Sequence, residues 1–315
     1  MRIKAAVLRE FNKPFSIEYI DLEEKEGEAM VDIKAVGVCG RDLVAWKGGF
    51  RNLKTPLILG HEIFGLYKGG PVAVFPARVS NSCKGSHSEG LCYSIIGEET
   101  QGGYAEKISV PTWNLIPLSD PGLEKYAAAT CGVATIIHAL KVAGLDKGSK
   151  VLVTGASGGV GIHGIQYLID KGYQVYAHVR SDEKEEIVKG LGAYPVRSFE
   201  FYKSEGKVDG VFEIVGGITI NDSMLSLRRG GRLVLIGNIN GKDIILSRPA
   251  FIVMNEINIT GSAAYTREEY EEAIRIISMG KVRPFYKVYK FEDINQAYYD
   301  IMHGKVVGRA VLSMS

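Results

Sequence analysis

Hydrophobic and polar positions follow two different patterns along the chain. Through about the first hundred residues, short apolar runs are separated by Gly, Pro and charged turns. Examples are KAAVLREF from Lys4, EAMVDIKAVGV from Glu28 and PVAVFPA from Pro71. Short runs of this kind predict a compact antiparallel β domain, to which we assign residues 1–120.

From about Lys125 onward, helical and strand patterns alternate. The strand-like segments are KVLVTG, YQVYAHV, VDGVFEIVGG, GRLVLIG and INITGSAA, and segments of helical period lie between them. Alternation predicts a parallel sheet with helices on both faces over residues 121–265. A helix over REEYEEAIRIISMG follows, and the last apolar run is expected to pair with the β domain, so residues 266–315 return to it. The predicted fold class is α/β, with a β domain and a doubly wound domain.

The stretch VLVTGASGGVGIHGIQYL, from Val151, reads as a strand, a tight turn and a helix. Gly155, Gly158, Gly159 and Gly161 would let the backbone approach a pyrophosphate, and the free N–H groups of the helix beginning near Val160 would point at the anion. The spacing is not the strict dinucleotide fingerprint, and such turns also occur as packing corners. We interpret it as a dinucleotide site because the following strand adds a second signal.

That strand, Gln174 to Val179, ends in Arg180 and Ser181, where an NAD site usually carries a carboxylate for the ribose hydroxyls. A cation at this place suits a 2′-phosphate, so the cofactor is predicted to be NADP(H). The alternative for Arg180 is a solvated surface arginine. Lys184 is either a second phosphate contact or one charge of the helical run SDEKEEIVK.

Composition sets wider limits. A chain of 315 residues with 46% hydrophobic residues is long enough for two domains. Its 38 basic and 36 acidic residues give a net charge of +2, without basic runs, which argues against a nucleic-acid partner. No stretch is expected to reach the apolar length that crosses a bilayer, and the N-terminus lacks the apolar segment of a secretion signal. We therefore expect a cytoplasmic protein with no membrane partner.

Four residues offer a donor set for a metal. Cys39 ends a predicted strand, His61 and Glu62 follow another, and Cys131 lies near the start of a predicted helix. Two thiolates, an imidazole and a carboxylate are a sensible tetrahedral set for zinc. Because these residues are far apart in sequence, the spacing equally allows buried structural cysteines and a hydrogen-bonded core histidine.

The chain resembles the medium-chain dehydrogenase/reductase superfamily, which includes the zinc alcohol dehydrogenases. The resemblance covers essentially the whole chain, and its motifs in order are VCGRD, GHE, GGYAEK, CGVATIIHAL, VLVTGASGGVGIHGIQ, GGRLVLIG and GKVVGRAVL. Within the superfamily the chain looks most like archaeal acryloyl-coenzyme A reductases and quinone-reductase-like proteins. The resemblance implies a GroES-like catalytic domain, a Rossmann domain, and a cleft between them for cofactor and substrate.

The resemblance also assigns roles to residues. It places one catalytic zinc on Cys39, His61 and Cys131, with Glu62 as the acid that can take the fourth position. It makes Asp42 the carboxylate that orients the histidine ligand; the alternative for Asp42 is a simple turn or cap residue.

For the cofactor, the resemblance places Thr135 against the nicotinamide ring and adds Gly237 and Arg309, from the GGRLVLIG and GKVVGRAVL motifs, to the binding residues.

Two positions depart from the alcohol dehydrogenase pattern. Arg41 stands where a Ser or Thr usually relays the alcohol proton, and an arginine stays protonated and cannot do so. Val44 stands where a histidine is often found. As a cation beside the metal, Arg41 suits an anionic substrate or the cofactor pyrophosphate. The alternative is a salt bridge from Arg41 to Glu62 or Asp42.

The structural zinc lobe of the family uses four cysteines, of which this chain keeps only Cys83 and Cys92; Ala77 and Ser80 stand at the other two positions. Even with His87 the set lacks a clear fourth ligand, so we expect no structural zinc. Cys83 and Cys92 are either free thiols or a disulfide.

We therefore expect a zinc-dependent NADP(H) oxidoreductase that acts on a small molecule. The expected reaction is hydride transfer to or from a carbonyl or alcohol, with zinc as Lewis acid. One alternative is reduction of an activated C=C bond in an enoyl thioester or a quinone, and another is a non-catalytic NADPH-binding scaffold. By analogy with the family, a homodimer or homotetramer would form through the edge strand near EINITGSAAY.

Overall fold

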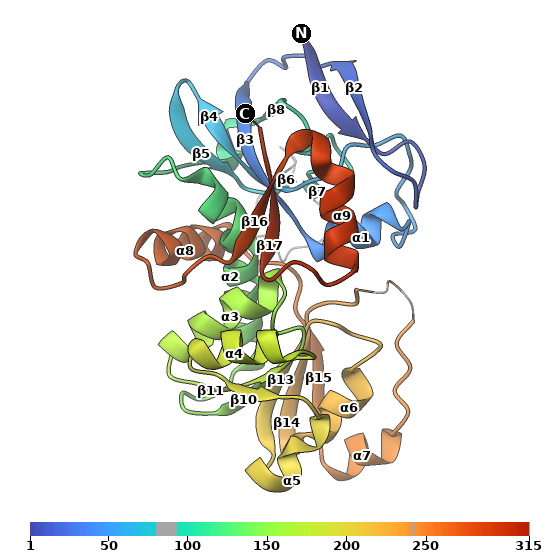
Figure 1. Cartoon of the computed structure of the whole chain (residues 1–315), viewed down its shortest axis with the longest axis vertical. Coiled ribbons are helices and arrows are strands. Elements are labelled where there is room, and N and C mark those ends of the chain that lie inside the picture. Colours follow the sequence, from blue (N-terminus) through green and yellow to red (C-terminus); the bar gives the residue numbers. More distant parts are fainter. Residues whose placement is uncertain (80–92, 240, 242, 315) are drawn as a thin grey trace.

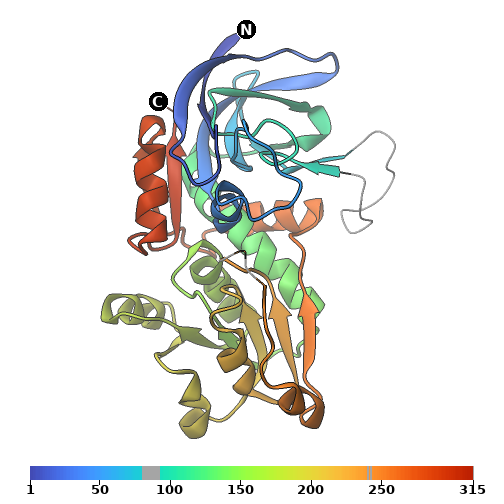
Figure 2. The same ribbon diagram turned by 90° about the vertical axis from the view of Figure 1, so that its right-hand side faces the viewer.

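The computed structural model describes residues 1–79, 93–239, 241 and 243–314. Figure 1 shows two units arranged one above the other along the longest axis, with the β-rich unit at the top and the parallel sheet below. Figure 2 shows helix α2 (Leu123–Ala143) running from one unit into the other. The chain returns to the upper unit at its C-terminal end, where the last strand and helix lie on its flank.

The upper unit contains a seven-stranded sheet in the order β16-β17-β3-β4-β5-β9, with β8 also paired to β3. Its β17 pairs antiparallel with β3, as expected for the last apolar run of the chain. The elements of this unit are β1 (Arg2–Val7), β2 (Ser16–Asp21), β3 (Glu28–Val38), α1 (Gly40–Trp46), β4 (Glu62–Tyr67), β5 (Gly70–Val74), β6 (Ala77–Val79), β7 (Tyr93–Ile95), β8 (Lys107–Pro111), β9 (Leu115–Pro117), β16 (Tyr286–Lys290), α9 (Ile294–Met302) and β17 (Arg309–Ser313).

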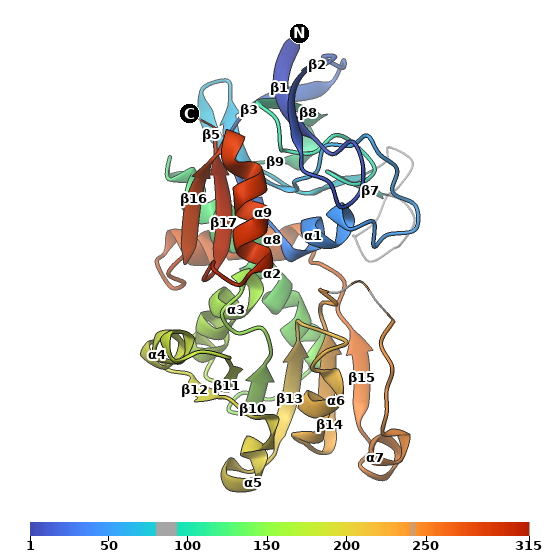
Figure 3. The ribbon, with the colours of Figure 1, turned by 45° about the vertical axis from the view of Figure 1, so that its right-hand side comes forward.

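The lower unit is a six-stranded sheet whose pairings are all parallel. Figure 3 shows its strands side by side in the order β12-β11-β10-β13-β14-β15. Its elements, besides α2, are β10 (Lys150–Val153), α3 (Gly159–Asp170), β11 (Gln174–His178), α4 (Asp182–Gly190), β12 (Tyr194–Val196), α5 (Tyr202–Glu205), β13 (Val208–Glu213), α6 (Ile220–Leu225), β14 (Leu227–Leu235), α7 (Pro249–Met254), β15 (Asn258–Gly261) and α8 (Arg267–Ser278).

This strand order positions the site. The chain moves outward from β10 to β12 and then returns to the other side of β10 to form β13. Connections leave β10 and β13 in opposite directions, which makes their carboxyl ends a switch point, the place where doubly wound sheets bind ligands. The glycine-rich turn after β10 lies at this switch point.

The sheet is covered on both faces, as its alternating pattern predicts. Val151 and Val153 of β10 belong to the core formed with α2, α3 and α8, whereas Leu152 between them belongs to a second core with Ile220 and Met224 of α6. Successive side chains of a strand point to opposite faces, so this division places helices on both sides of the sheet.

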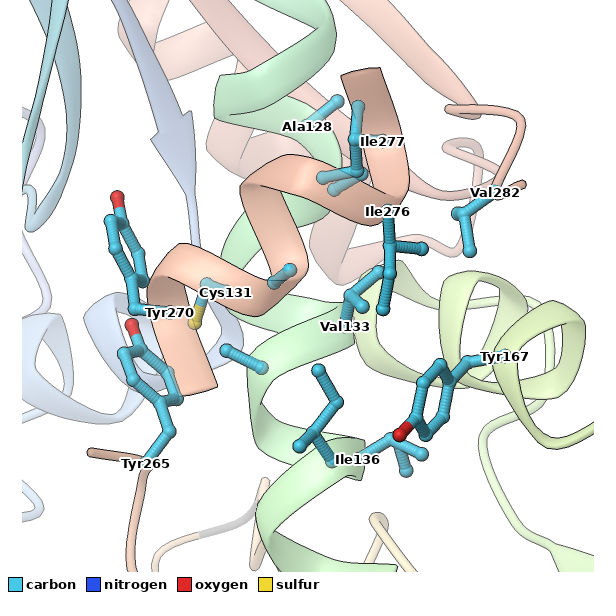
Figure 4. Close-up of a cluster of buried hydrophobic side chains, with 14 of the residues drawn as sticks. Ala128, Cys131, Val133, Ile136, Tyr167, Tyr265, Tyr270, Ile276, Ile277 and Val282 are labelled. Atoms are coloured by element: carbon cyan, nitrogen blue, oxygen red, sulfur yellow. The ribbon is translucent and has the colours of Figure 1, made fainter. Parts of the chain in front are cut away.

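Helix α2 corrects one expectation. By length and apolar composition it could cross a membrane, contrary to the expectation that no segment would; it is the one such helix in the described ranges. However, 78% of its most apolar window is buried inside the protein. It contacts β3, β4, β16 and β17 of the upper unit as well as α3, α8 and β14, and Figure 4 shows its Val133 and Ile136 near Ile276 of α8 and Tyr167 of α3. Its hydrophobicity therefore serves the core that joins the two units.

Candidate active site

Four potential ligand residues converge where the two units meet. They are Cys39, which directly follows β3, His61 and Glu62 at the entry to β4, and Cys131 inside α2. One ligand atom from each lies within 4.8 Å of the other three, and all four residues are buried. Two details of the sequence prediction are wrong: His61 and Glu62 precede and open a strand instead of following one, and Cys131 is in the interior of its helix. The predicted convergence itself is present.

The chemistry of this cluster fits a divalent cation. Neither carboxylate oxygen of Glu62 has a hydrogen-bond partner among the described residues, although Oε1 forms an ion pair with Arg309 at 3.0 Å, and burial raises the pKa of this carboxyl to about 8. Within the part of the chain that the structure describes, Oε2 has no such contact, and a buried carboxylate oxygen is costly unless it is paired or binds a metal. Two sulfur atoms, an imidazole nitrogen and a carboxylate oxygen are ligands that zinc accepts in a tetrahedral arrangement. The residues present therefore fit zinc.

Asp42 fixes the orientation of the histidine. Its Oδ1 lies 3.1 Å from His61 Nδ1, while its Oδ2 accepts the Cys39 backbone N–H at 2.9 Å and the Tyr104 hydroxyl at 3.1 Å. With Nδ1 donating to the carboxylate, Nε2 of His61 is the nitrogen left for a metal. This is the role that the resemblance implied for Asp42. Tyr104 was not singled out, although it lies in the GGYAEK motif.

The two cysteines are electrostatically different. A hydrogen bond from Cys131, followed by the charges of Arg309 and His61, lowers the pKa of Cys39 well below that of an ordinary thiol. The same hydrogen bond, together with burial, raises the pKa of Cys131. Tyr265, whose pKa is raised by burial and by a hydrogen bond to Cys131, lies beside this sulfur, and Figure 4 shows the two side chains next to each other. Sequence reasoning gave no signal for Tyr265.

Arg309 connects the cluster to the glycine turn. Its Nη2 lies 3.0 Å from Glu62 Oε1, and both side chains are buried. Its guanidinium also fills the space beside Gly159, where an added Cβ would come within 2.5 Å of Arg309 Cζ. The adjacent Gly308 donates its backbone N–H to the Ser157 carbonyl at 2.9 Å. The arginine expected to bind cofactor thus lies between the potential metal ligands and the start of α3.

A buried histidine links the start of α3 to the segment that precedes β16. His163 of α3 has Nδ1 2.7 Å from the Gly159 carbonyl, and its Nε2 accepts the Phe285 backbone N–H at 2.8 Å. Burial lowers the pKa of His163 to about 3, so the ring is neutral and can accept one bond while donating the other. The Phe285 carbonyl in turn accepts the backbone N–H of Arg309 at 3.0 Å.

The glycine turn has the geometry of an anion site. Gly155 has a positive φ of 60°, and an added Cβ on Gly161 would lie 2.3 Å from the Gly155 carbonyl oxygen. The amide of Ile162 bonds to the carbonyl of Gly158, the N-cap of α3. The amides of Gly159, Val160 and Gly161 therefore lie in the first turn of α3, whose free N–H groups and positive dipole end attract a phosphate.

Two further predicted cofactor residues are packed tightly in the lower unit and in α2. Thr135 is buried in α2, one turn after Cys131. Gly237 follows β14, and an added Cβ there would lie 2.4 Å from the Ile214 carbonyl oxygen, so this position has no room for a side chain.

The predicted 2′-phosphate residues lie together at the end of β11. Arg180 is exposed, and Ser181 is the N-cap of α4. Lys184 donates its ammonium to the Gly304 carbonyl at 3.1 Å, so it contacts the C-terminal segment.

Arg41 does not take either of the partners considered from the sequence. Its guanidinium forms a two-point contact with Glu98, in which Nη2 lies 2.8 Å from Oε2, and it lies 4.6 Å over the ring of Phe50. The alternative considered from the sequence, a salt bridge to Glu62 or Asp42, is therefore wrong, and the guanidinium is already paired with the nearly buried carboxylate of Glu98. Cys83, Cys92, Ser80 and His87 lie outside the described residues; Ala77 is in β6.

Comparisons with known proteins agree with this arrangement. Residues 25–120 match the sequence model of the alcohol dehydrogenase GroES-like domain, and residues 159–279 match that of the zinc-binding dehydrogenases. The chain is 32% identical to an alcohol dehydrogenase of Geobacillus stearothermophilus over 99% of both proteins. It is 30% identical to acryloyl-coenzyme A reductase of Sulfurisphaera tokodaii, over 98% of this chain and 99% of that protein.

A solved structure is similar over the full length. The cobalt- and zinc-bound thermostable alcohol dehydrogenase of Pyrobaculum aerophilum is 26% identical, with a TM-score of 0.89 and complete coverage of both chains. A zinc-binding family and a nucleotide-binding Rossmann-like fold together imply zinc and NAD(P) as cofactors. The chain therefore belongs to the zinc-type medium-chain dehydrogenase/reductase family and is an oxidoreductase of that family.

Proposed function

We propose that this protein is an NADP(H)-dependent oxidoreductase that transfers hydride between the nicotinamide and a small carbonyl or alcohol substrate, with one zinc ion per chain. The observation that carries the proposal is the convergence of Cys39, His61, Glu62 and Cys131 next to the glycine turn that begins α3. A metal cluster and a dinucleotide site side by side are what hydride transfer to a polarised substrate requires.

The four residues would hold the zinc, which when bound supplies Lewis-acid polarisation of a substrate oxygen. Asp42 keeps His61 in the tautomer that presents Nε2. Two thiolates and a carboxylate carry more negative charge than one dication neutralises, and the buried Arg309 guanidinium beside Glu62 offsets the excess. The same arginine, against the first turn of α3, also faces the place where a cofactor pyrophosphate would lie.

The preference for NADP(H) rests on Arg180. It is exposed at the carboxyl end of β11, where the ribose of a dinucleotide lies in this fold, and no carboxylate follows the strand until Asp182. A guanidinium binds a phosphate by two parallel hydrogen bonds. NADPH should therefore bind more tightly than NADH.

Reduction of an activated C=C bond is a second candidate. Position 41 carries an arginine already bound to Glu98 instead of a hydroxyl, so this side chain provides no relay for an alcohol proton. The relative from Sulfurisphaera tokodaii is named acryloyl-coenzyme A reductase. In that reaction the site would stabilise an enolate oxygen, for which the same cluster serves.

Two measurements test the proposal. Metal analysis of protein purified without added zinc should give about one zinc per chain, as a site closed by three ligands and an acid predicts. NADPH consumption is then followed with a small aldehyde, a quinone and an enoyl thioester of coenzyme A. Consumption with the aldehyde supports the first candidate, and consumption with the thioester or quinone alone supports the second. Absence of zinc and of turnover would favour a non-catalytic NADPH-binding scaffold.

A further inference from the structure

Two sequence motifs that lie far apart in the chain are packed against each other under the metal cluster. Tyr104, from GGYAEK, is fully buried, and its ring lies close to Gly60, the residue before His61 of the GHE motif. An added Cβ on Gly60 would come within 2.6 Å of the Tyr104 ring. The Gly103 N–H also bonds to the Gly60 carbonyl at 2.7 Å, so the tyrosine and the histidine segment form one unit.

The hydroxyl of Tyr104 also contacts the cluster, through Asp42. It donates to Asp42 Oδ2 at 3.1 Å, and the other oxygen of that carboxylate faces His61 Nδ1. The Asp42 carboxylate therefore has three donors around it: the Cys39 backbone N–H, the His61 ring and the Tyr104 hydroxyl. Donors on both oxygens resist rotation of the carboxylate plane, and the His61 ring is held by that plane.

A second tyrosine extends this chain of hydrogen bonds. Tyr298 of α9 is buried and donates its hydroxyl to the Tyr104 oxygen at 3.3 Å. Its ring packs edge-on against Phe15 at a centroid distance of 4.9 Å and lies 6.1 Å from Trp46 of α1. Because the Tyr104 oxygen accepts the hydrogen bond from Tyr298, the proton of the Tyr104 hydroxyl is directed to Asp42.

We propose that Tyr104, and Tyr298 through it, are positioning residues of the metal centre: they hold Asp42, and through it His61, in the orientation that binds zinc. This inference rests on the zinc site of the proposed function and adds residues to it. The C-terminal helix α9, more than 230 residues beyond His61 in the chain, thus contributes to metal affinity.

The test compares Tyr104→Phe, Tyr298→Phe and the double variant with the wild type. Phenylalanine keeps each ring and its packing and removes only the hydroxyl. The matched control is Tyr126→Phe, because the buried Tyr126 hydroxyl has no hydrogen-bond partner within the ranges that the structure describes. Zinc affinity is measured by competition with a chromophoric chelator, and the cobalt-substituted proteins are compared by their visible absorption, which reports ligand geometry.

We expect Tyr104→Phe to weaken zinc binding by about 10-fold, the lower end of the range found when a direct partner of a metal ligand is removed, because Tyr104 acts on His61 through Asp42. Tyr298→Phe should weaken it by about 2- to 10-fold, the effect of one net hydrogen bond. Because Tyr298 acts only through the Tyr104 hydroxyl, the double variant should bind zinc as Tyr104→Phe does. The cobalt spectrum should change in Tyr104→Phe, and Tyr126→Phe should match the wild type in both measurements.

Zinc affinity and a cobalt spectrum of Tyr104→Phe equal to those of the wild type would overturn the inference while leaving the proposed function intact. An effect of Tyr298→Phe that persists undiminished in the Tyr104→Phe background would overturn the series arrangement and assign Tyr298 a packing role. A wild-type protein that binds no zinc would overturn the proposed zinc function and this inference with it.

Discussion

The guanidinium of Arg309 lies 3.0 Å from the carboxylate of Glu62, and both groups are buried. Even beside this cation, burial raises the pKa of Glu62 to about 8, so desolvation of the carboxylate outweighs the attraction of the arginine. In metal-free protein the folded state therefore holds a proton on Glu62 that the unfolded chain, with its ordinary pKa of 4.5, has already lost at neutral pH.

The raised pKa of Glu62 makes the stability of metal-free protein depend on pH. Between about pH 4.5 and pH 8 the folded protein binds one more proton at Glu62 than the unfolded chain, so the stability of metal-free protein should fall with rising pH. This one group contributes a slope of at most about 1.4 kcal/mol per pH unit. Glu62→Gln should remove that slope, and the stability difference between variant and wild type should grow with pH. Urea unfolding with a chelator present, at several pH values, measures it.

Zinc provides the control for this prediction. A cation bound at the cluster stabilises the ionised carboxylate, so saturating zinc should flatten the wild-type slope. Equal slopes in metal-free wild type and Glu62→Gln would show that Glu62 is not the group responsible.

Arg180 should determine the choice of cofactor. Arg180→Ala removes a charge-assisted contact to a 2′-phosphate, and we expect NADPH affinity to fall by about 10- to 100-fold while NADH affinity stays unchanged. Arg229→Ala is the matched control, because Arg229 is an exposed arginine of β14 in the same unit and is paired with Glu256. Both affinities are measured by fluorescence titration. Equal NADPH binding by wild type and Arg180→Ala would remove the reason for predicting NADP(H).

The glycine turn can be tested by a pair of glycine substitutions. In Gly161→Ala the new Cβ would lie 2.3 Å from the Gly155 carbonyl oxygen, so the turn must move. We expect a loss of stability of about 1–3 kcal/mol, the usual effect of overpacking, and weaker binding of the dinucleotide. Gly190→Ala in α4 meets no atom within 4 Å and should stabilise the protein by up to about 1 kcal/mol. Thermal unfolding and cofactor titration of both variants decide whether Gly161 has the proposed role.

The outer edge of the parallel sheet is the expected place of self-association. Strand β15 is an edge strand with Ile259 partly exposed, and Val253 and Met254 of the preceding α7 are 72% and 74% exposed. Unpaired backbone groups at a sheet edge can pair with a second copy. We propose a homodimer, or a homotetramer built from it, through β15. Ile259→Lys should then yield monomers in sedimentation experiments.

Tyr194→Lys supplies the comparison, because Tyr194 is exposed on β12, the opposite edge of the same sheet. Dissociation by this variant but not by Ile259→Lys would place the interface elsewhere, and a monomeric wild type would contradict the proposed association.

Much of the fold is already present in local sequence patterns. EAMVDIKAVGV coincides with β3, and the segment after the glycines forms α3. The strand predicted from Gln174 to Val179 is β11, which ends one residue earlier, at His178. The alternation of strand and helix patterns predicted the parallel sheet, since periodicity depends only on which face of an element is buried. The potential ligands Cys39, His61, Glu62 and Cys131 could be named because the residue type alone shows which side chains carry a thiol, an imidazole or a carboxylate.

What no local pattern contains is the set of contacts between distant segments. The partner of Arg41 is Glu98, and the donors around Asp42 include Tyr104, itself directed by Tyr298 from α9. Each of these depends on how loops and helices pack after the two units form, because a hydrogen bond requires two atoms about 3 Å apart whatever their separation in sequence. Residue types and their periodicity thus determined the elements and the chemistry available, and only the tertiary structure decided which of those groups meet.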